Sequence, residues 1–277
     1  MSRMRQGWEL TKKSWALLRS NKILFKFPIY GALSALALVI VLVMPGIYLI
    51  DDGQRVIGGL LVAIGAYGAT FVSIYFSVGL AATADGIFHG RNTTFSDGMA
   101  VARSHTGAIA GWAALSALVG LIISALQRGG SIGEAIAAMV IGTAWALISF
   151  MAVPVLAFEG PGPWTTLKRS ASLFKERWVG QVTGNIAIGG IVFLLGVLPA
   201  IALIVGGAYL WASDDGGAGL AGGAILVAIG ALVLTVSMLI TQAMRAVFGV
   251  ALYRYATTGE APATFTEDEL RSAVRIK

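Results

Sequence analysis

Residues 153–178 read VPVLAFEGPGPWTTLKRSASLFKERW, and this stretch decides what kind of fold the chain forms. An apolar run ends at Phe158, Gly and Pro alternate over residues 160–163, and a basic segment with apolar side chains at helical spacing follows. Gly and Pro interrupt helices, and a basic amphipathic helix beside an apolar run is typical of a membrane surface. The stretch therefore predicts that the chain leaves a membrane, runs along its surface and enters it again.

The composition of the whole chain agrees with a membrane protein. Of the 277 residues, 57% are hydrophobic and 12% are charged, and the mean hydropathy is +0.80. Soluble domains carry about 25% charged residues, so this chain has too few charged side chains to cover a surface that faces water. Its length accommodates about six spans of roughly 20–25 residues. We therefore predict an all-α, polytopic integral membrane protein with six transmembrane helices and additional amphipathic interfacial helices.

The predicted layout is a single membrane domain over residues 1–277. Its segments are a basic interfacial helix (1–26), spans 1 and 2 (27–84), a cytoplasmic loop with a short helix (85–106), spans 3 and 4 (107–158), a second interfacial helix (159–178), spans 5 and 6 (179–256) and a cytoplasmic tail (257–277). The first apolar run is expected to remain as a span. A secretory signal would have a shorter basic region and a small-residue cleavage site.

The distribution of positive charge predicts the orientation of the six spans. All of the 20 Lys and Arg residues except Arg55 and Arg128 fall on the side that holds both termini, whereas the acidic pairs 51–52 and 214–215 fall on the other side. Short loops rich in Lys and Arg stay in the cytoplasm. We therefore expect a multi-pass protein of the bacterial plasma (inner) membrane with both termini cytoplasmic.

An internal repeat is predicted from two basic segments. Residues 12–19 read KKSWALLR and residues 168–175 read KRSASLFK, and each segment directly precedes an apolar span. Residues 95–103 precede spans 3 and 4 in the same way, although their sequence matches poorly. Similar units at similar spacing indicate repeats, so we predict three copies of an interfacial helix followed by a two-span hairpin. The alternative is a chance similarity between basic amphipathic helices.

The stretch VPVLAFEG at 153–160, followed by Pro163 and by LKRS at 167–170, resembles a known pattern. It is similar to the membrane region attached to some bacterial glycerophosphodiester phosphodiesterases, and to stand-alone multi-span proteins of unknown function that share this region. The resemblance implies a helical multi-span fold. The phosphodiesterase activity is not expected, because the chain has no room for the soluble catalytic domain and no acidic cluster for its metal.

The basic segments at 1–26 and 163–178 are the predicted lipid-binding sites. Trp side chains favour the headgroup region, and cations near the surface are attracted to anionic lipid. The candidate residues are Trp8, Lys12, Lys13, Trp15, Arg19, Trp164, Lys168, Arg169, Lys175, Arg177 and Trp178. For the first segment, a solvated basic tail is the alternative.

A second candidate site is a charge within the apolar spans. Arg245 lies in span 6, and charges inside a membrane are costly and often functional. One alternative is that Arg245 extends its side chain to the inner interface. The other is that it lies inside and pairs with Glu159 or Asp85, which would fix helix packing or line a polar cavity.

The residues that catalysis or cofactor binding would require do not converge. The chain has no cysteine and two histidines, His89 and His105. Asp85 and His89 have helical i, i+4 spacing, yet Gly86 and Gly90 favour a loop, so a metal site is not expected. Phosphate-binding loops, zinc-protease motifs and nucleophile elbows are not found. We predict no cofactor and no enzymatic activity.

The sequence therefore predicts an integral membrane protein that does not catalyse a reaction. The favoured hypothesis is a protein that binds anionic lipid of the inner leaflet or scaffolds other proteins. A transporter or channel for a small or lipid-like solute is the alternative, and a membrane-embedded enzyme is a third. Nucleic acid is not an expected partner, because the basic residues border apolar spans instead of forming a run interleaved with aromatics. Glycine-rich faces on spans 2 and 6 favour a homo-oligomer.

Overall fold

The computed structural model describes residues 13–177, 193–213 and 217–259, without the side chains of residues 174–177 and 218. Over these ranges the regular elements are helices, and six stretches are long and apolar enough to cross a membrane. They are Lys22–Asp51, Arg55–Phe88, Thr106–Arg128, Ile132–Phe158, Phe193–Ser213 and Gly219–Thr258. The predicted all-α architecture with six spans is confirmed, and the protein is a multi-pass membrane protein.

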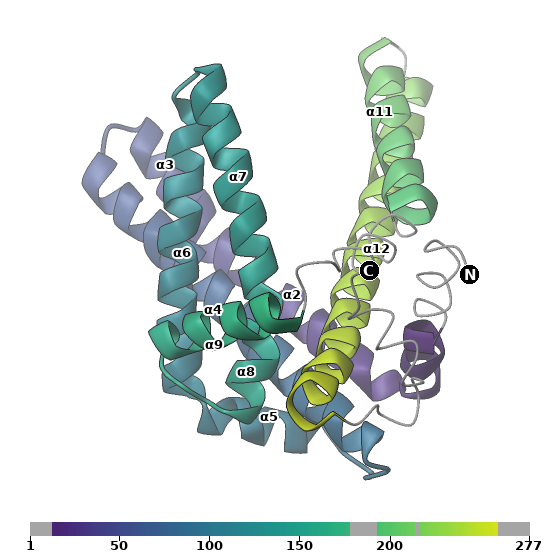
Figure 1. Cartoon of the computed structure of the whole chain (residues 1–277). Coiled ribbons are helices and arrows are strands. Elements are labelled where there is room, and N and C mark those ends of the chain that lie inside the picture. The colour runs from purple at the N-terminus through teal and green to yellow at the C-terminus, as the bar shows by residue number, and fades with distance from the viewer. Residues whose placement is uncertain (1–12, 178–192, 214–216, 260–277) are drawn as a thin grey trace.

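The first two spans form an antiparallel hairpin (Figure 1). One arm consists of η1 (Lys22–Phe25), α2 (Lys26–Leu38), the π-helical segment η2 (Val39–Val43) and α3 (Met44–Asp51), and the other arm is α4 (Arg55–Phe88). A short turn between α3 and α4 reverses the chain.

Spans 3 and 4 form the second hairpin, with α6 (Thr106–Arg128) as one arm. The other arm is α7 (Ile132–Ser149) continued by α8 (Ala152–Phe158). The interruption between α7 and α8 precedes Pro154. Proline has no N–H to donate to the carbonyl of Phe150, and its ring crowds that carbonyl.

The third hairpin contains η3 (Phe193–Val197) and α11 (Leu198–Ser213) in one arm and the long α12 (Gly217–Thr258) in the other. Like η2, η3 is π-helical, and Pro199 follows it at the same spacing as Pro45 follows η2. A wider turn accommodates the missing donor and the bulk of the proline ring. The first arms of hairpins 1 and 3 therefore share an irregularity that the second hairpin does not have at that place.

Glycines bring the two arms of hairpins 1 and 3 into close contact. A Cβ atom on Gly58 would lie 2.5 Å from the carbonyl oxygen of Gly46, and one on Gly223 would lie 2.6 Å from the carbonyl oxygen of Gly207. Small residues let the backbones of membrane helices approach and gain van der Waals contact. Gly58 on span 2 and Gly223 on span 6 therefore form contacts within their own hairpins.

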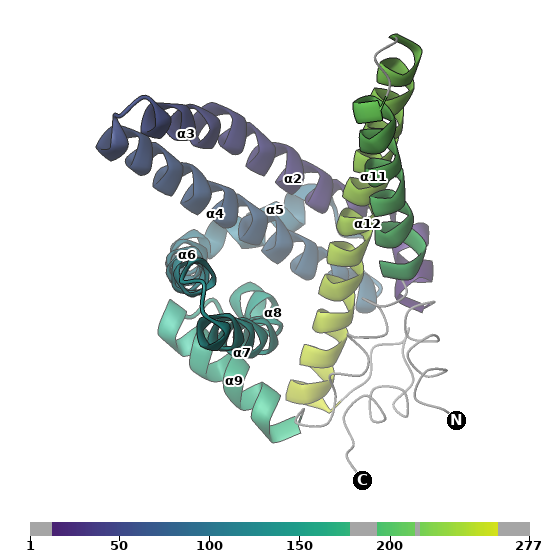
Figure 2. The same ribbon diagram turned by 90° about the horizontal axis from the view of Figure 1, so that it is seen from above.

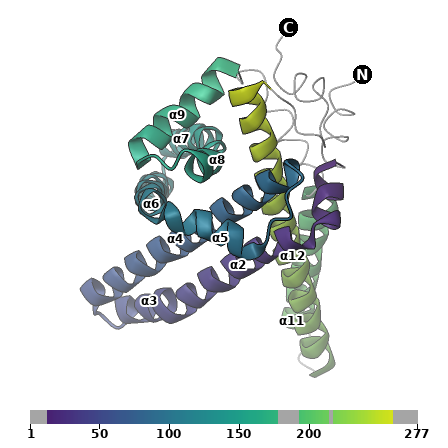
Figure 3. The ribbon, with the colours of Figure 1, turned by 90° about the horizontal axis from the view of Figure 1, so that it is seen from below.

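Three shorter helices lie at the end of the molecule opposite the hairpin turns: residues 13–20, α5 (Phe95–Ser104) and α9 (Pro163–Arg177). We call this end the core end and the other the turn end. Helix α5 packs against α4, and α9 packs against α6, α7 and α8 (Figure 3). Each of these two helices therefore rests on the hairpin that precedes it in the chain.

Small residues occupy the buried faces of all three short helices. Ser14, Gly98 and Ser170 are buried, and so are Leu18 and Ala102, which lie one helical turn beyond Ser14 and Gly98. A small side chain at this position lets a surface helix approach a span closely. The structure thus contains three successive units of surface helix and hairpin, and α5 resembles the other two in burial more than in sequence.

The buried core lies at the core end. Its large side chains include Phe27, Leu80, Met151 and Leu252, at the ends of spans from all three hairpins. Toward the turn end the hairpins point in different directions (Figure 2), and side chains such as Ile132 are exposed. Apolar side chains in this position are expected where lipid is the solvent. The core end is therefore the part of the molecule where the hairpins meet.

Candidate functional site: a charged junction between the hairpins

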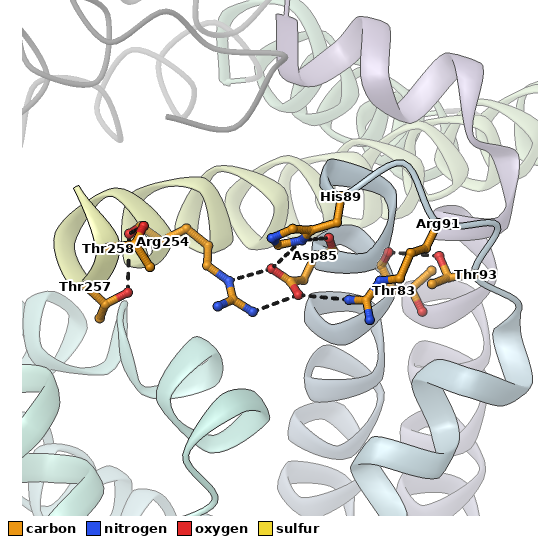
Figure 4. Close-up of polar contacts among 8 residues, drawn as sticks. All are labelled: Thr83, Asp85, His89, Arg91, Thr93, Arg254, Thr257 and Thr258. Carbon is orange, nitrogen blue, oxygen red and sulfur yellow. Dashed lines mark hydrogen bonds and ion pairs between the residues drawn. The ribbon is translucent and has the colours of Figure 1, made fainter. Parts of the chain in front are cut away.

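Asp85, near the end of α4, forms the most buried ion pair among the described residues. Its side chain is 5% exposed, and the guanidinium of Arg254 on α12 donates to both carboxylate oxygens, from Nε at 2.6 Å and from Nη2 at 2.8 Å (Figure 4). A two-bonded Arg–carboxylate pair fixes geometry as well as charge. It connects hairpin 1 to hairpin 3.

The turn after α4 adds a second arginine to Asp85. Gly90 has a φ of +68°, its N–H donates to the carbonyl of Ile87, and the N–H of Arg91 donates to the carbonyl of Gly86. This is the Schellman ending of a helix, which requires a left-handed residue. It turns Arg91 back so that its Nη2 lies 3.4 Å from a carboxylate oxygen of Asp85.

Asp85 therefore lies in a helix and not in the predicted loop. Helix α4 continues to Phe88, four residues past the predicted end of span 2 at residue 84. Gly86 is accommodated there because Thr93 packs against it: a Cβ atom on Gly86 would lie 2.1 Å from Cγ2 of Thr93. His89, at the end of the helix, places Nδ1 2.8 Å from the carbonyl oxygen of Asp85.

Glu159 forms the second half of the site at the end of α8. Its Oε1 accepts a hydrogen bond of 2.7 Å from the hydroxyl of Tyr253 and one of 2.9 Å from Nε of Arg169. The site thus takes one residue from hairpin 2, one from α9 and one from α12. Gly160, with a φ of +57°, follows at once, and the ring of His105 packs against it.

Neighbouring residues on α12 join these two acids. Tyr253 faces Glu159 and Arg254 faces Asp85, because successive side chains on a helix point about 100° apart. The ring of Phe158 lies between them: its centroid is 5.2 Å from that of Tyr253 and 4.6 Å from Cζ of Arg254. The latter contact is a cation–π interaction. We call Asp85, Glu159, Arg169, Tyr253 and Arg254 the charged junction.

Residues 56–263 match a family of unknown function, DUF6159. The chain belongs to this family. The match includes the whole charged junction. It carries no link to glycerophosphodiester phosphodiesterases, so the predicted resemblance holds only as far as an uncharacterised family. A comparison with curated proteins found no match.

In this DUF6159 protein Arg245 does not join the junction. It lies nine residues before Arg254, about 13 Å along the helix, and its side chain is exposed. Within the described part of the chain it has no hydrogen bond or ion pair. Arg254 and not Arg245 is the partner of Asp85, and Arg169 is the arginine at Glu159.

Arg245 instead lines a groove between hairpins 2 and 3. The groove has a volume of about 510 Å³. Its walls come from α4, α7, α8, η3 and α12. In the described part of the chain, Arg245 thus lies at this groove, whereas Asp85 and Glu159 lie in the charged junction.

The predicted interfacial residues fall into three groups in this DUF6159 protein. Trp15, Arg19, Trp164 and Lys168 are exposed, whereas Lys13 is half-buried and Arg169 is turned toward Glu159. Trp8, Lys12 and Trp178 lie outside the described residues, as do the side chains of Lys175 and Arg177.

The junction brings together residues from all three hairpins and from α9. Both carboxylate oxygens of Asp85 accept hydrogen bonds from the guanidinium of Arg254. Among the described residues, no group of three or more metal-ligating side chains is found. Sequence analysis missed Tyr253 and Arg254. The available signal was an arginine between two tyrosines, Tyr253 and Tyr255, at the end of an apolar run.

Proposed function

We propose that this protein binds anionic phospholipid at the cytoplasmic surface of the bacterial inner membrane, without catalysing a reaction. One observation carries the proposal. Trp15 and Arg19 on the first surface helix, and Trp164 and Lys168 on α9, form two pairs with the same spacing of four residues, and all four side chains are exposed. Residues four apart lie on one face of a helix.

The chemistry of these pairs suits the headgroup region of a membrane. An indole ring favours the boundary between water and hydrocarbon, and each Lys or Arg near an anionic surface adds about 1 kcal/mol of attraction. Trp164 is 65% exposed. A large aromatic side chain in water is unfavourable, which supports lipid as its neighbour.

The other face of each helix is attached to the protein. Ser14 and Leu18 are buried on the first helix, and Thr166, Ser170 and Leu173 are buried on α9. The two helices are therefore held in place while their Trp and cation face outward. Such a platform could also recruit a protein partner to the membrane, which is the scaffolding form of the same proposal.

The test compares two double variants in lipid nanodiscs that contain phosphatidylglycerol and phosphatidylcholine. R19Q/K168Q removes the cations of the two Trp–cation pairs, and R55Q/R128Q removes the two cations next to the turns of hairpins 1 and 2. Both variants lower the net charge equally. We expect R19Q/K168Q, but not R55Q/R128Q, to reduce the enrichment of phosphatidylglycerol around the protein. Equal enrichment in the two variants would contradict the proposal.

Transport of a lipid-like solute is the second candidate, and the groove between hairpins 2 and 3 favours it. The groove contains polar side chains, including Gln242 and Arg245, beside apolar ones. Liposomes containing the purified protein would move a fluorescent phospholipid between leaflets faster than protein-free liposomes if this candidate holds. Equal rates would exclude it.

A homo-oligomer belongs to the same proposal. Gly59 on α4 and Gly222 on α12 have open space around them, so a Cβ atom would meet nothing within 4 Å. Small outward-facing residues suit contact between copies. The chain has no cysteine, so a single Cys at position 59 would report such contact by cross-linking, and its failure to cross-link in membranes would exclude this face.

A further inference from the structure

The groove between hairpins 2 and 3 contains two hydrogen-bond donors without a partner in the described part of the chain. One is the guanidinium of Arg245, and the other is the hydroxyl of Ser149, whose oxygen is buried. Gln242, which also lines the groove, donates to the hydroxyl of Ser77 at 3.1 Å. Buried polar groups are normally hydrogen-bonded, so the Ser149 hydroxyl lacks an acceptor, and the guanidinium of Arg245 on the same groove adds positive charge. The groove is therefore suited to an anionic acceptor.

The rest of the groove is apolar. Phe150 and Val153 line it on the side of hairpin 2, and Phe193, Val197 and Met238 line it on the side of hairpin 3. Met238 lies two turns before Arg245 on α12, and α12 runs from the turn end to the core end. Along α12, Met238 therefore lies on the turn-end side of the groove and Arg245 on its core-end side.

The polar part of the groove lies at the level of the surface helix α9. The hydroxyl of Ser170 on α9 donates to the carbonyl oxygen of Ile148, and Ile148 directly precedes Ser149. Trp164 and Lys168 on the same helix face outward. A headgroup next to α9 would place its phosphate at the depth of Ser149 and Arg245.

We propose that this groove binds one anionic phospholipid, with its phosphate at Arg245 and Ser149 and an acyl chain along Val197 and Met238. Its volume of about 510 Å³ lies within the roughly 300–1,000 Å³ of small-molecule sites. Charge complementarity selects the occupant: a guanidinium prefers a phosphate oxygen, and the apolar walls suit a hydrocarbon chain. This site is separate from the outward pairs on the surface helices and does not depend on them.

Native mass spectrometry of the purified, delipidated protein tests the proposal by titration with phosphatidylglycerol. We expect one tightly bound lipid per chain in the wild type, and a dissociation constant about tenfold or more higher in R245Q, because a charge-assisted hydrogen bond is lost. The matched control is R55Q, which removes an exposed cation at the turn end and should bind as the wild type does. Equal affinity of R245Q and R55Q would overturn the proposal.

Two further measurements are needed. One distinguishes a lipid headgroup from free phosphate as the ligand of the groove, and the other distinguishes the groove from the surface helices as the site of the tight lipid. M238W fills the apolar part of the groove and keeps the charge of Arg245, so it should raise the dissociation constant of phosphatidylglycerol by a similar factor. Displacement of the lipid by inorganic phosphate, or normal binding by M238W, would show an anion site instead of a lipid site. R19Q/K168Q should retain the single tight lipid; if it loses that lipid while R245Q keeps it, the surface helices and not the groove form the tight site.

Discussion

Arg254 is the residue whose loss the fold should tolerate least among the charged side chains described. Its partner Asp85 is 5% exposed at the side chain, whereas Arg91, which also approaches Asp85, is 64% exposed and lies at 3.4 Å. A buried carboxylate without its cation is strongly destabilising, whereas an exposed pair contributes little. The two arginines at one acid therefore form a natural comparison.

We expect R254Q to lower the free energy of unfolding by about 3 kcal/mol and R91Q by less than about 1 kcal/mol. The loss of unfolding free energy in the double variant D85N/R254Q should be smaller than the sum of the losses in D85N and R254Q, because no buried charge remains without a partner. Denaturant unfolding in detergent micelles is measured for the wild type and for the four variants R254Q, R91Q, D85N and D85N/R254Q. Equal losses for R254Q and R91Q would show that the junction does not hold hairpins 1 and 3 together.

At the residue scale, sequence reasoning found the acids but not their partners. Asp85 and Glu159 are conspicuous because each ends an apolar run. Arg245 and Arg254 lie on the same span, and the hydropathy of the span does not distinguish which one reaches the acids. That choice depends on how far α12 slides along α4 and α8, which is a property of tertiary packing.

At the scale of elements, α5 begins with a reciprocal cap. The hydroxyl of Thr94 accepts from the N–H of Asp97, and the carboxylate of Asp97 accepts from the N–H of Thr94 at 2.8 Å. Such a capping box satisfies two donors that the first turn of a helix leaves free. Ser131 and Glu134 form the same arrangement at the start of α7.

The cap of α5 predicts a pH dependence. The backbone N–H of Thr94, and then its hydroxyl, lower the pKa of Asp97 below its usual value. Because the folded-state pKa is the lower one, the stabilisation is complete above the unfolded-state pKa and is lost as the pH falls through the folded-state pKa. The melting temperature of the wild type should therefore approach that of D97N as the pH falls below the ordinary Asp value of about 3.9 and through the lower folded-state pKa.

D97N is the control for the wild type in this series, because its residue 97 cannot titrate. A difference in melting temperature that stays constant over the acidic range would contradict the assignment. Differential scanning fluorimetry in a detergent that does not titrate over the same range measures both proteins.

The surface helices illustrate what a repeat in sequence can predict. The segments at 12–19 and 168–175 correctly indicate two helices that bury Ser14 and Ser170. The third helix, α5, places Gly98 at the equivalent position, where it approaches the carbonyl oxygen of Gly79. Three different side chains satisfy one requirement for small size, so the third copy is visible only in the packing.

At the scale of the whole molecule, the hairpins are joined at one end and separate toward the other (Figures 1 and 2). The core and the charged junction both lie at the core end. The positive-inside distribution of charge predicts that this end faces the cytoplasm.

Single-cysteine labelling tests that orientation without background, because the natural chain has no cysteine. Gln54 and Ser20 are exposed at the turn end and the core end respectively. A membrane-impermeant maleimide should label Q54C in intact spheroplasts and S20C only after permeabilisation. Labelling of S20C from outside would reverse the layout, and the proposed inner-leaflet lipid binding with it.

The sequence by itself determined that lipid surrounds the spans, how many spans there are and where the surface helices lie along the chain. Hydropathy and helical periodicity suffice for this, because they are local properties of the chain. Only the tertiary structure decided that Tyr253 and Arg254 meet Glu159 and Asp85, and that Arg245 lines a groove. These outcomes depend on the register between helices from different hairpins. In an apolar chain many registers bury similar surface, so close packing at glycines and a few polar contacts select one of them.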